Sequence, residues 1–343
     1  MKIAVIGACG WAGQRHLAAF RSLGVQVTHL VDPDPRCAAI AAAIGARALG
    51  DHRDLRNADL DAVSVALPPA DQPDVCKAFL QRGVSVLCEK PVAATAVQAA
   101  EIRDLAAERS GAVFMPGFLL RFHPVFLHMR AIVLSGELGP IHELKIDGRV
   151  KRTEITGWRC DPDMGGVALV NAIHAFDLAR WLVGELGPPV FSTIGNRHFP
   201  IATEDWMDAI LYSKSGARVQ IRSAWWPFRE DDIDTLDLDG WVVRLRIEAE
   251  RGTLILTRDG YMHVHSGGTA AIAMHSTIDL FQAEIAQFLD CVKNKKVTPI
   301  TADDNLAAQR LVEQTKSRAD LFRAAANSAA VTFGSQNAIA LKS

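Results

Sequence analysis

The chain has 343 residues, of which 49% are hydrophobic, and its formal net charge at pH 7 is −2. A chain of this length normally divides into two domains, and the balance of apolar and charged residues is typical of a globular protein. The small net charge provides no attraction toward nucleic acid or a membrane surface. The six cysteines form no CxxC pair and no secretory signal is visible, so we predict a cytoplasmic protein without a zinc site.

The first 31 residues follow the order of a dinucleotide-binding unit. An apolar strand over residues 2–6 leads into a glycine-rich turn, a helix and a second strand over residues 25–31. The glycines let the backbone approach a pyrophosphate, and the helix N-terminus offers unpaired N–H groups. The spacing is GxxGxxG rather than GxGxxG. The residues predicted to hold the cofactor in this turn are Gly7, Cys9, Gly10, Trp11 and Gly13.

Asp32 ends the second strand, roughly 20 residues after the last glycine. A carboxylate at this place can accept hydrogen bonds from a ribose 2′-hydroxyl, but it repels a 2′-phosphate. The sequence therefore favours NAD as the cofactor. NADP stays possible because Arg36 follows closely.

Helices and strands alternate through residues 1–122, which predicts a doubly wound parallel sheet of the Rossmann type. Helices are expected over residues 36–44, 71–81 and 95–108, the last capped by Thr95, and strands over 62–66, 84–88 and 112–115. Ligands bind at the carboxyl ends of such strands. Pro68, Glu89 and Lys90 lie there, so we predict that all three contact the cofactor.

Lys90 follows an apolar strand directly and precedes Pro91. At the carboxyl edge of a parallel sheet its ammonium group can donate to a substrate oxygen, and burial can lower the pKa of a lysine into a catalytic range. The alternative is that Glu89 and Lys90 only end the strand and face solvent.

The pattern changes in residues 123–330, where strands with alternating faces follow one another. This predicts an α+β domain with a large, mostly antiparallel, open-faced sheet, completed by helices over residues 278–293 and 302–326. Residues 331–343 are predicted to be a tail without regular structure. An exposed sheet face with apolar side chains would need covering, so we expect a homo-oligomer, a dimer or tetramer formed through this sheet.

The most apolar helix, over residues 167–183, follows the glycine pair at positions 165 and 166. Asn171 and His174 are three residues apart and share a face, and Asp177 lies one turn further. Histidine is well suited to exchange a proton near neutral pH, and a glycine pair lets a ligand approach the backbone. His174 is therefore a candidate acid/base, with a hydrogen-bonded core histidine as the alternative.

The order of these segments resembles the Gfo/Idh/MocA oxidoreductase family. The shared elements are the glycine loop, the strand-end EKP, GFxxRFxP, WRxDP, GG and N-x-x-H-x-x-D. The resemblance implies NAD(P)-dependent oxidation of a secondary alcohol on a sugar, cyclitol or sugar derivative, or the reverse reduction. It implies that Lys90 is the active-site lysine and His174 the acid/base. Asn171, also assigned to the site, departs from the commoner Asp-x-x-x-His arrangement.

Several assignments stay open in the sequence. Either His174 or Lys90 can be the base that takes the hydroxyl proton. Arg121, Trp158 and Arg159 are expected to contact the substrate, Trp158 by stacking on a sugar ring and Arg159 by pairing an acidic group. No metal site is predicted. The alternative functions are a dinucleotide-binding sensor without turnover and a reductase of an imine or an unsaturated ring.

Overall fold

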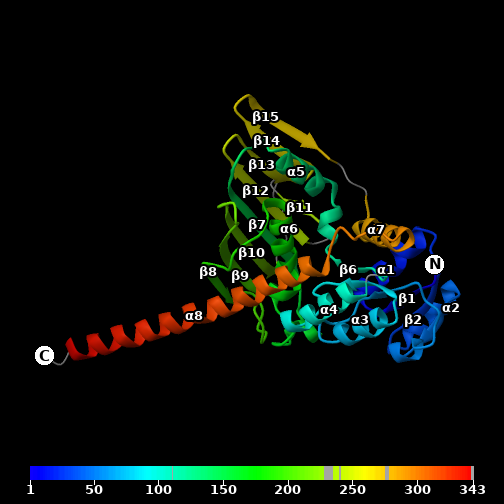
Figure 1. Ribbon diagram of the computed structural model, residues 1–343. Coiled ribbons are helices and arrows are strands. Elements are labelled where there is room, and N and C mark those ends of the chain that lie inside the picture. The colour runs from blue at the N-terminus through cyan, green and yellow to red at the C-terminus, as the bar shows by residue number, and fades with distance from the viewer. Residues whose placement is uncertain (110, 228–234, 239–240, 275–277, 341–343) are drawn as a thin grey trace. The chain divides into compact units, whose positions relative to one another are not determined.

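The computed structural model describes residues 1–109, 111–227, 235–238, 241–274 and 278–340, with only the backbone described from residue 322 onward. These residues form two compact units (Figure 1). Unit 1 comprises Met1–Leu134, Asp161–Gly165 and Ala273–Arg310, and unit 2 comprises Ser135–Cys160, Gly166–Ile272 and Leu311–Ser343. Each unit is therefore built from segments that are separated in the sequence.

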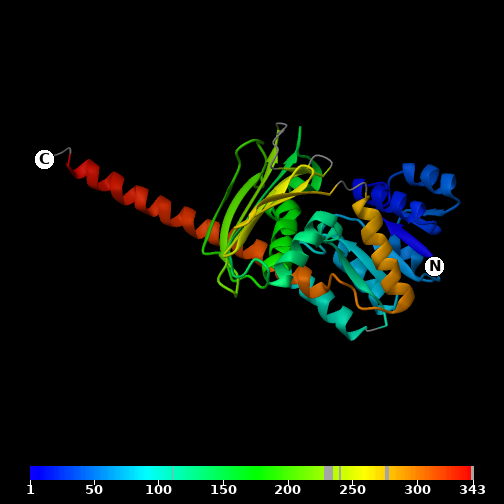
Figure 2. The same ribbon diagram turned by 90° about the horizontal axis from the view of Figure 1, so that it is seen from above.

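Unit 1 contains a parallel sheet in the strand order β3-β2-β1-β4-β5-β6. This is the Rossmann order, and it confirms the predicted fold class. Helices α1 and α7 lie on one side of the sheet, and α3 and α4 lie on the other (Figures 1 and 2). The central strands β1, β4 and β5 are buried along their whole length, which explains their almost continuous apolar sequences. The strands are β1 Ile3–Ile6, β2 Val27–Val31, β3 Arg47–Leu49, β4 Ala62–Val65, β5 Ser85–Glu89 and β6 Phe114–Gly117.

The helices of unit 1 agree with the sequence pattern at most of their ends. Thr95 caps α4, and together with Gln98 it forms a capping box. The sequence pattern did not predict β3 or the helix α5, which begins at Pro124. The helices are α1 Trp11–Ser22, α2 Arg36–Ile44, α3 Gln72–Gln81, α4 Ala96–Glu108, α5 Pro124–Ser135 and α7 Leu280–Asn294, with the short turns η1 His52–Leu55 and η2 Leu119–Phe122.

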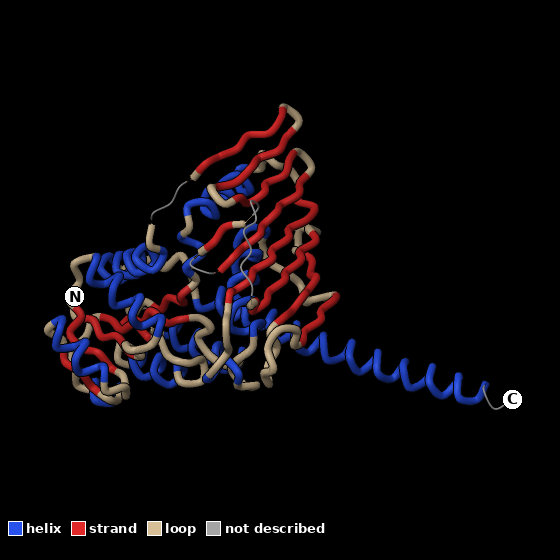
Figure 3. The backbone as a smooth tube through the Cα atoms, turned by 180° about the vertical axis from the view of Figure 1, so that it is seen from behind, coloured by secondary structure: helices blue, strands red, loops and turns tan. Residues whose placement is uncertain are grey.

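Unit 2 is built on a large mixed sheet, whose strands lie side by side in Figure 3. The strand order is β15-β14-β13-β12-β7-β10-β9-β8, with β11 paired to β12. Strands β7 and β10 run parallel, whereas β10 with β9, β9 with β8, and β7 with β12 run antiparallel. The strands are β7 Ile141–Lys151, β8 Phe191–Gly195, β9 Trp206–Tyr212, β10 Arg218–Trp226, β11 Leu236–Asp237, β12 Trp241–Ala249, β13 Gly252–Thr257, β14 Gly260–His265 and β15 Gly268–Ala273.

The two faces of this sheet differ in chemistry. Leu144, Ile146 and Val150 of β7 are buried on the face that packs against α6 (Ile173–Val183). On the other face the side chains of Lys145, Arg222 and Arg246 are about half exposed. The expectation of an apolar outward face is therefore wrong for these central strands. Successive side chains of a strand point to opposite faces of the sheet, and the apolar side chains of these strands point toward α6.

The last helix, α8, spans Ala302–Ala340 and continues through residues 331–340, where the sequence predicted no regular structure. The preceding residues 324–330 hold five alanines, the residue with the highest helix propensity, and the helix runs on from them. Among the described helices, none is both long and apolar enough to cross a membrane.

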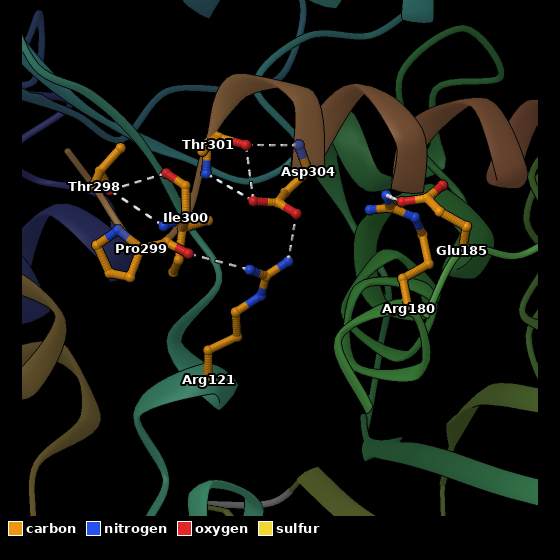
Figure 4. Close-up of polar contacts among 8 residues, drawn as sticks. All are labelled: Arg121, Arg180, Glu185, Thr298, Pro299, Ile300, Thr301 and Asp304. Atoms are coloured by element: carbon orange, nitrogen blue, oxygen red, sulfur yellow. Dashed lines mark hydrogen bonds and ion pairs between the residues drawn. The ribbon is translucent and has the colours of Figure 1, made fainter. Parts of the chain in front are cut away.

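Arg121, expected to contact the substrate, is 6% exposed and lies in an ion pair within unit 1 (Figure 4). Its Nη2 is 3.0 Å from Asp304 Oδ1, and its Nη1 donates to the carbonyl of Pro299 at 3.3 Å. Asp304 Oδ2 in turn accepts from the backbone N–H of Thr301 at 2.8 Å. Burial raises the pKa of Asp304, but the Arg121 charge and these hydrogen bonds hold it below its ordinary value. The pair thus joins η2 to the first turn of α8.

Helix α7 carries a buried acid, Glu284, which is 0% exposed. Neither of its carboxyl oxygens has a hydrogen-bond partner among the described residues. Burial raises the pKa of Glu284 well above its ordinary value, the charge of Glu89 raises it further, and Lys90 lowers it. A carboxyl group in this setting is held in its neutral form.

Replacing Asp304 should show that Arg121 is a structural residue. We expect Asp304→Asn to lower the free energy of unfolding at pH 7 by about 3 kcal/mol, since it leaves a buried guanidinium without its counter-charge. Asp303→Asn is the matched control, because Asp303 pairs with Arg103 at 2.9 Å and the two side chains are 72% and 31% exposed. That variant should change stability by less than about 1 kcal/mol. Urea denaturation measures both. An Arg121→Met variant of normal stability but greatly raised substrate KM would instead support substrate contact.

Glu284→Gln should stabilise the protein increasingly as the pH rises. The folded-state pKa of Glu284 lies above its unfolded value of about 4.5. Above that pH the unfolded chain releases the proton while the folded protein still holds it, so the free energy of unfolding falls as the pH rises. An amide has no such cost. In urea denaturation, the advantage of the variant should grow between pH 5 and pH 8 by about 1.4 kcal/mol per unit of pKa difference. Glu108→Gln, at an exposed site on α4, should show no such trend. An advantage that stays constant with pH would contradict the assignment.

Candidate functional site

The glycine turn after β1 is a cradle that only glycine can form. Gly7 has φ +79°, and a Cβ built on it would lie 2.3 Å from the carbonyl oxygen of Ala66. A Cβ on Gly13 would lie 2.0 Å from the carbonyl oxygen of Gly7. Gly10 caps α1 without a side-chain hydrogen bond, so the first N–H groups of the helix are open to a ligand. The loop fits a dinucleotide pyrophosphate, as its sequence predicted.

Asp32 holds this loop in place. Its Oδ2 accepts from the backbone N–H of Cys9 at 2.8 Å, and its Oδ1 accepts from the N–H of Asp34 at 3.0 Å. Arg36, the reason for considering NADP, donates from Nη2 to Asp34 at 2.6 Å. Burial, and then the Asp32 charge, raises the pKa of Cys9 to about 12, which keeps this residue a thiol. Trp11 lies in the first turn of α1 with 62% of its surface exposed.

The turn that carries Lys90 is fixed by buried polar groups. Gln72 Nε2 donates to the carbonyl oxygens of Glu89 and Pro91, at 2.9 and 2.6 Å. His16 lies between Ser64, at 2.6 Å from its Nδ1, and Glu89, at 3.0 Å from its Nε2. Burial raises the pKa of Glu89, but the hydrogen bond with His16 and the charges of His16 and Lys90 bring it below its ordinary value. An ionised carboxylate only accepts, so His16 Nε2 donates to it.

The carboxyl ends of β1, β4 and β5 bring the predicted residues of unit 1 to one edge of the sheet. Gly7 follows β1, Pro68 lies in the turn after β4, and Lys90 follows β5. The strand order changes direction between β1 and β4, which is the position where open α/β sheets bind ligands.

In unit 2, the helix with His174 begins with a π-helical turn, η4, over Ala168–Ala172. Such turns occur often at functional sites. Gly166, with φ +86°, precedes it, and a Cβ there would lie 2.3 Å from Glu204 Oε1. The backbone carbonyl of Glu204 accepts from the N–H of Val167 at 2.9 Å, and its Oε1 accepts from the N–H of Ala168 at 3.1 Å. The space above Gly166 is thus filled by Glu204, so the expectation that a ligand approaches the backbone there does not hold for Gly166.

Asn171 and His174 pack against two tryptophans of the sheet. Trp225 Nε1 donates to Asn171 Oδ1 at 2.5 Å. The indole N–H can only donate, so Asn171 must turn its oxygen to Trp225 and its NH₂ group elsewhere. The His174 ring lies 4.9 Å from the ring of Trp241, and His174 is 4% exposed. Asp177 is 1% exposed, which fits a structural role.

Trp158 and Arg159 lie in the short helix η3, Gly157–Cys160. The Arg159 guanidinium carbon is 4.7 Å from the centre of the Trp158 ring, a cation–π contact. Arg159 also lines a polar pocket together with Arg152, which the sequence analysis did not single out.

The predicted residues thus gather within each unit. Unit 1 brings together the glycine loop, Asp32, Pro68, Glu89 and Lys90, while Arg121 is used in its ion pair. Unit 2 brings Asn171 and His174 together on one helix. Sequence reasoning missed Gln72, His16 and Glu204, because their partners lie between 17 and 73 residues away along the chain.

Comparison with curated proteins gives relatives of modest identity. Inositol 2-dehydrogenase of Corynebacterium glutamicum (strain R) is 30% identical over 189 residues, 54% of each chain, so the chain matches about half the length of this relative. The D-xylose 1-dehydrogenase (NADP(+)) 2 of Haloferax volcanii is 24% identical over 322 residues, 91% of this chain and 95% of the relative. Among solved structures, levoglucosan dehydrogenase in complex with NADH and levoglucosan is 16% identical, with a TM-score of 0.82 over 93% of this chain and 97% of that chain.

Two family models match successive parts of the chain. Residues 1–118 match the oxidoreductase family with an NAD-binding Rossmann fold, and residues 126–255 match the GFO/IDH/MocA C-terminal domain. The first contains the glycine loop and Lys90, and the second contains Asn171 and His174. The chain belongs to the Gfo/Idh/MocA family of NAD-binding oxidoreductases.

Proposed function

We propose that this protein is an NAD-dependent dehydrogenase that oxidises a secondary alcohol of a sugar, a cyclitol or a derivative of either, or reduces the corresponding ketone. The observation that carries the proposal is the position of Lys90. It follows β5 at the carboxyl edge of the parallel sheet, the same edge at which β1 enters the glycine loop. An amine is thereby held at the edge where the sheet binds its dinucleotide.

The residues of unit 1 fit NAD. Gly7, Gly10 and Gly13 leave room for the pyrophosphate, and Asp32 offers its carboxylate to the ribose. The pairing of Arg36 with Asp34 supports NAD over NADP, because it engages the nearby cation. When bound, the nicotinamide supplies the hydride acceptor or donor.

Two side chains then handle the proton. His174 is our choice for the base that takes the hydroxyl proton, and Lys90 donates to the same oxygen and stabilises its developing negative charge. The reverse assignment, with Lys90 as the base and His174 in support, stays open. Asn171 does not act as a base, since its oxygen is bonded to Trp225, and its NH₂ group is suited to orient a substrate hydroxyl. Trp158, partly exposed beside Arg159, is suited to stack on a sugar ring.

The names of the relatives support a polyol or sugar substrate, since they describe dehydrogenases of inositol and xylose. We further propose that the protein is cytoplasmic, in keeping with six free cysteines. We also keep the proposal of a homo-oligomer formed through the sheet of unit 2. The outward face carries charges of both signs, for example Arg222 beside Asp208, so the contact would be polar rather than apolar.

Replacing either acid/base residue should lower turnover strongly and leave cofactor binding nearly intact. Lys90→Ala and His174→Ala should each lower kcat by roughly a hundredfold or more, because each removes a group that acts on the reacting oxygen. NADH formation with a panel of sugars and cyclitols measures kcat, and titration calorimetry measures the Kd for NAD.

The matched controls are Lys77→Ala on α3 and His263→Ala on β14, which should keep near-normal turnover. Near-normal turnover in both test variants would refute the assignment. NADH binding without turnover of any alcohol by the unmodified protein would favour a sensor, and turnover of imines alone would favour the reductase.

Cofactor preference should depend on the two aspartates after β2. Asp32→Ser/Asp34→Ser removes the charge that repels a 2′-phosphate and releases Arg36 to pair with it. The ratio of kcat/KM for NAD to that for NADP should fall by about tenfold or more, as expected for removing a like-charge contact. Asp34→Ser alone, which keeps Asp32, should shift the ratio less. An unchanged ratio in the double variant would show that Asp32 does not set the preference.

A further inference from the structure

Unit 2 contains a polar pocket with a volume of about 450 Å³, just beyond the end of β7. This is large enough for a small molecule. Its charged lining consists of Lys151, Arg152 and Arg159 against one acid, Glu154, and Thr153 and Thr156 add two hydroxyl groups. The lining therefore carries an excess of positive charge, whereas the protein as a whole is slightly negative.

The two arginines are built into this pocket rather than spread over the surface. The Nε atom of each is buried and has no hydrogen-bond partner among the described residues. Burial lowers the pKa of Arg152, and burial followed by the charge of Arg152 lowers the pKa of Arg159. A buried N–H donor without an acceptor costs free energy, and two guanidinium groups close together add repulsion. An anion between them would relieve both costs.

Backbone hydrogen bonds hold both arginines at fixed places. The N–H of Arg152 donates to the carbonyl of Trp226 at 2.9 Å. The carbonyl of Arg159 accepts from the N–H of Gly166 at 3.1 Å and from Thr203 Oγ1 at 3.1 Å. Gly166 lies two residues before the π-helical turn that carries Asn171. One wall of the pocket is thus tied directly to the start of the His174 helix.

The sheet also connects the pocket to the surroundings of His174. Val150 of β7 is paired with Trp225 on one side and with Trp241 on the other. Trp225 bonds Asn171, and Trp241 lies against His174. The chain then continues directly from Val150 into Lys151 and Arg152. Val150 is thus paired with both tryptophans that contact Asn171 and His174. The basic pocket begins at the next residue, Lys151.

We propose that this pocket binds an oxyanion group of the substrate, so that the enzyme acts on sugar acids or sugar phosphates in preference to neutral sugars. A carboxylate or a phosphate can accept two parallel hydrogen bonds from the Nε and Nη of one guanidinium, and a neutral hydroxyl cannot. Thr153 and Thr156 add neutral donors. This inference rests on the proposed dehydrogenase function, because that function makes the bound anion part of a substrate. The anion site itself rests on the pocket alone.

The test uses sugars that differ only at C6. Glucose, galactose and mannose are each compared with their uronate and their 6-phosphate, with the full-length protein and NADH in calorimetric titrations and with NAD in turnover assays. In at least one series we expect the uronate or the 6-phosphate to bind at least about tenfold more tightly than the neutral sugar, as for a charge-assisted hydrogen bond. The tighter of the two anions identifies the group as carboxylate or phosphate.

Variants locate the binding site. Arg152→Gln and Arg159→Gln should each remove most of this preference, and Arg152→Lys should retain part of it. Arg149→Gln is the matched control, since Arg149 pairs with Asp147 at 2.9 Å and does not line the pocket, and it should keep the preference. The comparison of neutral and anionic sugars in the unmodified protein needs no variant, so misfolding of a variant cannot obscure the result.

The outcomes separate this inference from the proposed function. Equal binding of neutral and anionic sugars in every series, or a preference that survives both glutamine variants, would overturn the anion site. Turnover of neutral sugars without such a preference would leave the dehydrogenase proposal standing. Arginine-dependent binding of the anions without NADH formation would support the pocket and refute the proposed reaction.

Discussion

The turn after β5 depends on one set of buried polar contacts. Gln72 bonds the carbonyls on both sides of Lys90, and Glu89 is held in turn by His16, whose other ring nitrogen bonds Ser64. These groups are removed from water, so each contact is expensive to break. As a result, the backbone at Lys90 has little freedom, and its ammonium group is offered from a fixed place at the edge of the sheet. Catalytic positioning of this kind normally requires such support.

In unit 2, a different set of contacts holds the helix and the side chain of His174. The backbone carbonyl of Glu204 accepts from the N–H of Val167, and its carboxylate accepts from the N–H of Ala168 and lies 3.3 Å from Lys316. Trp225 fixes the amide of Asn171, and Trp241 packs against the imidazole. The side chains that we propose for the chemistry are few, and the tryptophans that hold them come from strands distant in the sequence. We therefore expect that replacing a supporting residue such as Glu204 changes activity, although this residue does not touch the substrate.

The sequence predicted much of unit 1 because its signals are local. Apolar runs, glycines and caps such as Thr95 specify the alternation of strands and helices, and the parallel order then places Gly7 and Lys90 at one edge. The supporting contacts were not predictable in this way. Some contacts form only after the chain has folded, as between His16 and Glu89 or between Gly166 and Glu204. The spacing of these residues in the sequence does not predict them. Arg121 shows a different limit of the sequence, since its motif suggested substrate contact and its side chain forms a buried ion pair with Asp304.

The central claim is that Lys90 and His174 act on the same oxygen of one bound substrate. A crystal structure of the protein with NADH and a substrate found in the turnover assays tests it most directly. The account predicts that Lys90 Nζ and a ring nitrogen of His174 both lie within about 3.2 Å of a single substrate oxygen, the distance that proton transfer requires. If the two groups contact different parts of the substrate, or if either faces away from it, the account is contradicted.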